Sequence, residues 1–125
     1  MSTIRVDNFG PSAGGTTYSA RGIAKAWVNF NGTGTIAARD SENVSSLTDD
    51  GTGKYDVNFT SAFAAADYSA VVDGAFDTAD TAGSVVHTLR RIALSTSFVG
   101  VRCFTPGGSF DDSQVVTTIV AGDLA

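Results

Sequence analysis

The sequence predicts an all-β protein, and three observations support this fold class. β-branched residues are abundant, with 13 Val and 15 Thr, whereas helix-favouring residues are rare, with 4 Leu, 2 Lys and 1 Glu. The chain also has 14 Gly, which supply tight turns together with Ser and Asp. Short apolar runs alternate with these turns. We therefore expect a single small antiparallel β-sandwich, jelly-roll-like, with about eight or nine strands.

The chain divides into an arm and one domain. Its 125 residues suit one domain with a single core. Residues 1–20 are polar and Gly-rich, and Ile4, Val6 and Phe9 are their few apolar anchors. Because such a segment cannot form its own core, we expect an N-terminal attachment arm that orders only against a partner or a neighbouring subunit. Residues 21–125 are expected to form the sandwich.

The clearest strand is predicted at residues 54–60, where apolar and polar residues alternate strictly. A period of two predicts one buried face and one wet face. A Gly-rich turn at 49–53 joins this strand to its expected partner at 43–48. Further strand signals occur at 3–9, 22–30, 35–40, 68–76, 84–94, 97–104 and 114–120.

Three connecting segments carry signals of their own. Asn31-Gly32 predicts a tight turn. Residues 61–67 are expected to form one helical turn that packs Phe63 against the core. Residues 84–94 also fit helical spacing, but their β-rich neighbours favour a strand.

Composition argues against several classes of protein. The net charge is −5 without a Lys/Arg cluster, which disfavours nucleic-acid binding. A single Cys excludes an internal disulfide and a thiolate zinc cluster. No apolar run approaches the roughly 18 residues that span a bilayer. The first residues lack the features of a signal peptide, so we expect a soluble protein made in a cytoplasm.

Candidate chemistry is sparse. His87 is the single histidine, no G-x-S-x-G elbow accompanies it, and a hydrogen-bonded or solvent-facing strand residue is the favoured interpretation. Cys103 lies in an apolar strand and is expected to be an inert buried thiol. The acidic segment with Asp73, Asp77 and Asp80 does not fit EF-hand spacing, so solvated carboxylates are favoured over bound Ca²⁺. We expect no enzyme activity, no cofactor and no metal.

Residues 24–60 carry a family resemblance. They contain an opening AKAWVNFNGTGT, a turn NVSSLTD, and the segment GTGKYDVNF, in that order and closely spaced. This region resembles a module at the C-terminal end of many tailed-bacteriophage tail-fibre and related virion proteins. The resemblance is specific over about 37 residues and loose elsewhere. The family module usually ends a long fibre, whereas here it follows only about 20 residues.

The motif has physical expectations attached to it. Five residues are expected to be core anchors: Trp27, Phe30, Tyr55, Val57 and Phe59. Four glycines are expected to permit positive φ at turns: Gly32, Gly34, Gly51 and Gly53.

The resemblance implies a structural virion protein, a short fibre or a fibre-tip receptor-binding protein for host attachment. It implies a homotrimer, located in the virion, that joins other virion proteins through residues 1–20 and contacts a host cell-surface glycan or protein. Two alternatives stay open: a capsid decoration, cement or head-fibre protein, and a lectin-like module in which Trp27 and Tyr18 stack on sugars.

Receptor contact is expected at loops 73–83 and 105–113, because loops on a rigid sandwich vary without disturbing the core. The residues concerned are Asp73, Phe76, Asp77, Asp80, Phe110 and Asp111. An equally weighted alternative makes Phe76 and Phe110 core plugs.

Overall fold

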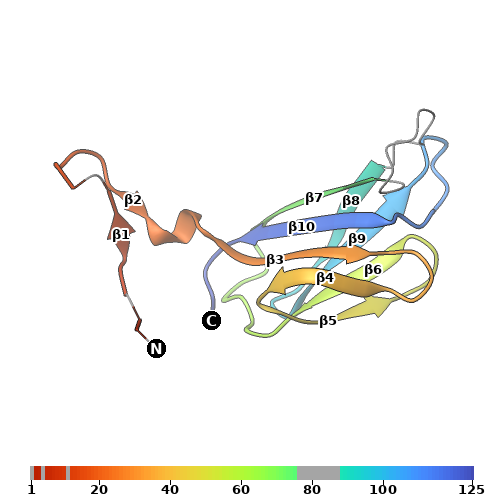
Figure 1. Ribbon diagram of the computed structural model, residues 1–125, viewed down its shortest axis with the longest axis horizontal. Coiled ribbons are helices and arrows are strands. Elements are labelled where there is room, and N and C mark those ends of the chain that lie inside the picture. The colour runs from red at the N-terminus through yellow and green to blue at the C-terminus, as the bar shows by residue number, and fades with distance from the viewer. Residues whose placement is uncertain (1, 4, 11, 76–87) are drawn as a thin grey trace.

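The expected β-sandwich is confirmed. The computed structural model describes residues 2–3, 5–10, 12–75 and 88–125, and within them two four-stranded antiparallel sheets pack together (Figure 1). The sheet orders are β4-β3-β10-β7 and β5-β6-β9-β8. The strands are β3 (Ala24–Asn31), β4 (Ala37–Glu42), β5 (Val44–Asp49), β6 (Lys54–Phe59), β7 (Ser69–Ala75), β8 (Thr88–Leu94), β9 (Phe98–Phe104) and β10 (Val115–Ala121).

The core lies between the two sheets, and most of it comes from the two central strands of each, β3 and β10 in one sheet and β6 and β9 in the other. Every second side chain of these strands points inward, as period-two alternation requires. The expected alternation of residues 54–59 is confirmed, and so are four of the five core anchors. The inward side chains of β3, β6, β9 and β10 are Ala26, Val28, Phe30, Tyr55, Val57, Phe59, Val99, Val101, Cys103, Val116, Thr118 and Val120.

Trp27 is the exception, and its assignment to the core was wrong. Its neighbours Ala26 and Val28 are buried, whereas Trp27 is partly exposed. Successive side chains of a strand point to opposite faces, so the inward position of these neighbours sends the indole outward. Trp27 therefore lies on the outer face of its sheet, where it pairs in register with Ile119 of β10.

The expected helical turn at 61–67 is not formed. Phe63 instead forms a β-bridge with Leu124, and its N–H donates to the Thr96 carbonyl at 2.8 Å. Because these backbone groups pair with remote segments, they are not available for local helical bonds. The inward packing of Phe63 is confirmed, since its ring is buried with a centroid 4.8 Å from that of Phe59.

The hairpin between β3 and β4 is wider than a two-residue Asn-Gly turn, and β4 begins at Ala37. The Asn31 side chain accepts from the Thr33 N–H at 3.2 Å and hydroxyl at 2.8 Å, which shapes the longer loop. Positive φ is confirmed at Gly34, Gly51 and Gly53 but not at Gly32.

Asn43 makes the corner between the two sheets at the other end of the sandwich. It is the one residue between β4 and β5 and has a φ of 53°, a conformation that Asn tolerates. Its side chain binds Ser61 twice, accepting from the N–H at 2.7 Å and donating to the carbonyl at 3.1 Å. The first residue of the NVSS motif thus fixes the crossing between the two sheets.

The N-terminal segment, which we call the arm, projects from the end of the sandwich where β3 begins (Figure 1). It contains a short antiparallel ribbon of β1 (Asn8–Phe9) and β2 (Tyr18–Ser19), followed by the 3₁₀ turn η1 (Ala20–Gly22). The strand expected at 3–9 is therefore formed only at its end, and its partner β2 also lies within the expected arm, residues 1–20.

Candidate functional site

Three connections meet at the end of the sandwich opposite the arm, which we call the tip (Figure 1). They are residues 32–36 between β3 and β4, 50–53 between β5 and β6, and 105–114 between β9 and β10. The tip thus contains the whole of one loop expected to contact a receptor, residues 105–113. The other expected loop begins at Asp73 on β7, and its residues Phe76, Asp77 and Asp80 lie outside the described residues.

One carboxylate joins these connections. Oδ1 of Asp112 accepts hydrogen bonds from the Gly53 N–H at 2.7 Å and from the Tyr55 hydroxyl at 2.8 Å. The same hydroxyl lies 2.8 Å from the Gly32 carbonyl oxygen, and the Gly32 N–H donates to the Ser113 carbonyl at 2.9 Å. Burial, and after it the hydrogen bond to Asp112, raises the pKa of Tyr55 far above its usual range. The phenol therefore remains a neutral donor.

Two motif glycines permit this close packing. A Cβ on Gly53 would lie 2.7 Å from the carbonyl oxygens of both Asp111 and Cys103. A Cβ on Gly32 would lie 2.6 Å from the Tyr55 hydroxyl oxygen. At Gly32 the requirement is therefore space for a neighbour, not an unusual φ. These contacts hold the long 105–114 loop against the β5–β6 turn at Gly53 and against the β3–β4 connection at Gly32.

Phe110 lies on the outside of this loop and is 42% exposed. Its ring stacks on Phe104 with centroids 4.7 Å apart, and the Lys54 ammonium lies 4.4 Å from its centroid. Phe110 is thus outside the hydrophobic core, in a small surface cluster. Sequence reasoning missed Lys54 and Phe104, because the cluster forms through the bridge between Phe104 and Phe110 and through the pairing of β6 with β9.

Charged side chains surround the cluster. The Arg102 guanidinium lies 3.6 Å from the Asp50 carboxylate and 3.4 Å from that of Asp56. Burial, and next the nearby Asp50 charge, raises the pKa of Asp56, although Arg102 opposes this shift. Asp111 lies next to Phe110, whereas Asp73 is exposed on the other sheet, paired in register with Thr117.

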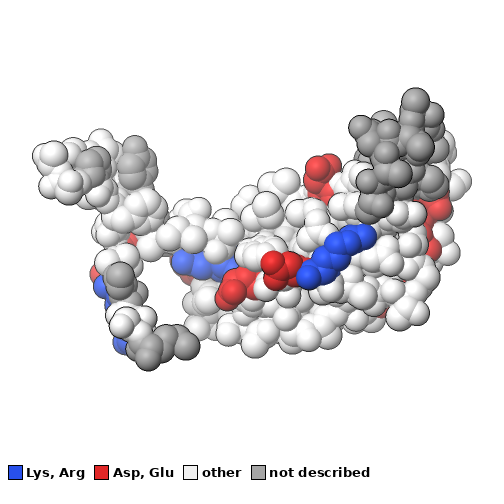
Figure 2. Space-filling model, in the orientation of Figure 1, with Lys and Arg blue, Asp and Glu red and all other residues white. Residues whose placement is uncertain are grey.

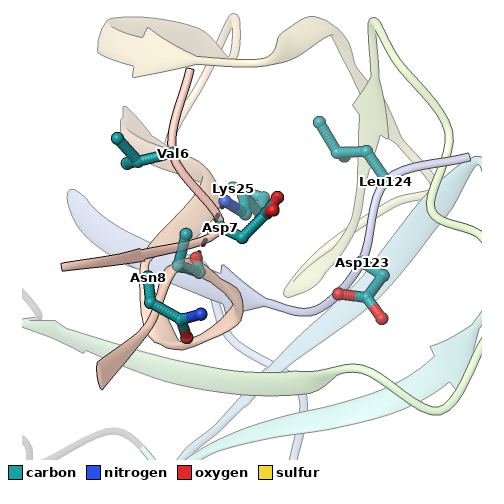
Figure 3. A pocket seen from close by; sticks show the side chains of 7 residues that line it. Val6, Asp7, Asn8, Lys25, Asp123 and Leu124 are labelled. Atoms are coloured by element: carbon teal, nitrogen blue, oxygen red, sulfur yellow. Dashed lines mark hydrogen bonds between the residues drawn. The ribbon is translucent and has the colours of Figure 1, made fainter. Parts of the chain in front are cut away.

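The arm stands away from its own sandwich. A cavity of about 510 Å³ separates them, with Val6 on the arm side and Leu124 on the opposite side (Figure 3). Val6 is 54% exposed and Phe9 is 46% exposed, while Ile4 lies outside the described residues. The Lys25 ammonium donates to the Ala20 carbonyl at 3.1 Å and so ties the end of the arm to β3.

The outer face of the β4-β3-β10-β7 sheet carries an apolar row. Val71, Ile119 and Trp27 are direct cross-strand neighbours on β7, β10 and β3, and Glu42 follows on β4. Val71 is 64% exposed and Ile119 is 47% exposed. Figure 2 shows a row of acidic and basic side chains across the part of this face formed by β3 and β4, and an uncharged band beside it over much of β10.

The remaining candidates do not assemble into a reaction centre in the part of the chain that the structure describes. Cys103 is fully buried, and burial raises the pKa of its thiol to about 11, which disfavours a thiolate nucleophile. His87 lies outside the described residues. Among those residues, no group of three His, Cys, Asp or Glu is placed to hold a metal ion, and no helix is long and apolar enough to cross a membrane.

Comparisons with protein-family models, with curated proteins and with solved structures find no match for this chain. The tip, the arm and the apolar row therefore have to be interpreted from their own chemistry.

Proposed function

We propose that this chain is a structural virion protein of a tailed bacteriophage, a short fibre or fibre-tip protein that binds the host receptor. In this proposal it is a non-catalytic homotrimer located in the virion. The arm end joins the particle, and the tip contacts a glycan or protein on the host cell.

The observation that carries the proposal is the construction of the tip. Asp112, Tyr55 and two glycines hold a long loop in place, and that loop presents Phe110 to solvent beside Lys54. A rigid loop with an exposed aromatic side chain and a charged rim is the chemistry of a binding surface. The tip also lies at the end of the molecule farthest from the arm (Figure 1), which suits an outward-facing contact.

The test is Phe110→Ala in assembled particles, with adsorption to host cells and melting temperature measured together. Adsorption is expected to fall about tenfold or more, as for a contact residue at the centre of an interface. The loss of stability should be well below the ~3–5 kcal/mol of a core Phe, because Phe110 is half exposed. The exposed turn residue Thr52 provides a matched Thr52→Ala control. Unchanged adsorption by the Phe110 variant would reject the receptor contact.

The apolar row gives some support to the alternative of a decoration or cement protein, because such proteins act by binding their neighbours. Locating the protein in a reconstruction of intact particles separates the two. Density on the capsid shell, rather than at a fibre or tail tip, would favour the alternative.

A further inference from the structure

The apolar row Val71–Ile119–Trp27 is a contiguous surface rather than scattered exposure. The three side chains are cross-strand neighbours on adjacent strands of one sheet, so they lie side by side. Isolated surface hydrophobics need no explanation, whereas adjacent ones on a flat sheet face indicate an interaction surface. In the monomer, solvent reaches most of Val71 and nearly half of Ile119.

The arm offers apolar surface that its own domain leaves open. Val6 is one of the residues that line the cavity between arm and sandwich, its side chain points away from Leu124 in Figure 3, and the residue is more than half exposed. The ribbon that carries the arm has only two residues in each strand. So short a hairpin is not stable by itself, and its order depends on contacts beyond the ribbon.

Charge and position match the two surfaces. The row has acidic side chains near both ends: Glu42 pairs in register with Trp27, and Asp73 follows Val71 by two positions on β7. Arg5 and Asp7 flank Val6 on the arm, while Glu42 and Lys25 lie next to Trp27 on the face, so each surface has a cationic and an anionic side chain beside its apolar residue. The row also lies in the half of the sheet nearest the arm, beside the start of β3 and the end of β10.

From these observations we infer that the apolar row of one copy receives the arm of a second copy of this chain, with Val6 seated on Ile119 and Trp27. This contact rests on the self-association proposed above, and it identifies the two surfaces through which the copies associate. Each copy donates an arm and accepts one, and a closed ring of head-to-tail contacts, such as the proposed trimer, uses every arm and every row. The tips remain uncovered.

The direct test is disulfide trapping between two differently tagged variants that each carry one introduced cysteine, Val6→Cys and Ile119→Cys. Mixing and mild oxidation should give a disulfide-linked pair of the two variants in preference to homodimers of either. The natural Cys103 is buried and stays in place. Pairing Val6→Cys with Thr52→Cys, an exposed tip position, is the matched control. Trapping no greater than in this control would overturn the arm contact.

A second measurement tests the outer sheet face that carries the apolar row, without changing the arm. In the double variant Val71→Thr, Ile119→Thr, both replacements retain β-branched side chains at exposed strand positions, so the domain should fold with an unchanged melting temperature. The dissociation constant from analytical ultracentrifugation should rise about tenfold or more.

The outcomes separate this inference from the receptor proposal. A wild-type chain that is monomeric at micromolar concentration overturns the inference and the homotrimer, but leaves host adsorption through Phe110 open. Self-association that persists unchanged in the double variant places the interface elsewhere. An arm that crosslinks only to another virion protein also overturns the inference.

Discussion

The Tyr55 hydroxyl lies 2.8 Å from the Asp112 carboxylate, and this contact joins a core residue of β6 to the loop that carries Phe110. The carboxylate also accepts from the Gly53 N–H, so a single oxygen connects the core, the β5–β6 turn and the β9–β10 loop. Hydrogen bonds to an ionised acceptor are stronger than neutral ones, which makes Asp112 the main polar anchor of the tip.

Removing this anchor should destabilise the protein measurably. Asp112→Ala leaves the Gly53 N–H without its acceptor, whereas the Tyr55 hydroxyl keeps the Gly32 carbonyl, and we expect the free energy of unfolding to fall by ~1–3 kcal/mol. Asp112→Asn keeps an oxygen in the same place and should lose less than half as much. Urea denaturation of both variants measures the difference. Equal losses for Asn and Ala would contradict the role of the oxygen as acceptor.

Gly53 and Gly34 form a matched pair that separates backbone conformation from crowding. Their φ angles are 66° and 62°, so Ala at either position meets a similar conformational cost. A Cβ at Gly34 has open space, whereas one at Gly53 lies 2.7 Å from two carbonyl oxygens. Gly53→Ala should therefore lose a further ~1–3 kcal/mol through overpacking. Thermal unfolding of the two variants checks this, and similar melting temperatures would refute the crowding argument.

Thr118 is a site where a substitution should stabilise the fold. Its hydroxyl is fully buried in the core and has no hydrogen-bond partner among the described residues. Thr118→Val removes the unsatisfied group with little change of shape, so the free energy of unfolding should rise by ~1–2 kcal/mol. Thr117→Val on the outer face of the same strand is the control; its hydroxyl accepts a long hydrogen bond from Asn29 at 3.4 Å, so a loss of up to ~1 kcal/mol, opposite in sign, is expected there. A destabilised Thr118 variant would show that the hydroxyl is satisfied after all.

Cys103 should make the protein less stable in alkali. Burial raises the folded-state pKa of its thiol to about 11, above the ~8.5 of an unfolded chain. As the pH rises above about 8.5, the unfolded state loses the thiol proton while the folded state keeps it, so stability falls until the folded pKa is passed. The slope contributed is at most ~1.4 kcal/mol per pH unit.

Cys103→Ala should therefore show a shallower decline of unfolding free energy between about pH 9 and 10, whatever its absolute stability. Chemical denaturation across that range measures the slope. Tyr55 does not affect the comparison, because the unfolded-state pKa of a tyrosine, ~10, starts the same decline in both proteins. Identical slopes for the two proteins would mean that the thiol is not protected by the fold.

Composition and period-two alternation were sufficient to predict the all-β class, the two-layer sandwich and most strand positions. Strands with one buried face carry their own signature, because each residue of β6 from Tyr55 to Phe59 reports which side faces the core. The turn glycines with positive φ were also predictable, since that conformation is a property of the local chain.

The tertiary structure alone decided which face β3 buries and which distant segments meet. Ala26, Trp27 and Val28 are all apolar, so the sequence of β3 does not show which of them face the core, and the indole was assigned to the core. The stacking of Phe110 on Phe104, the bridge of Phe63 to Leu124 and the space required at Gly32 all depend on contacts between remote segments. Such contacts leave no local pattern, because their energy comes from neighbours that the fold brings together.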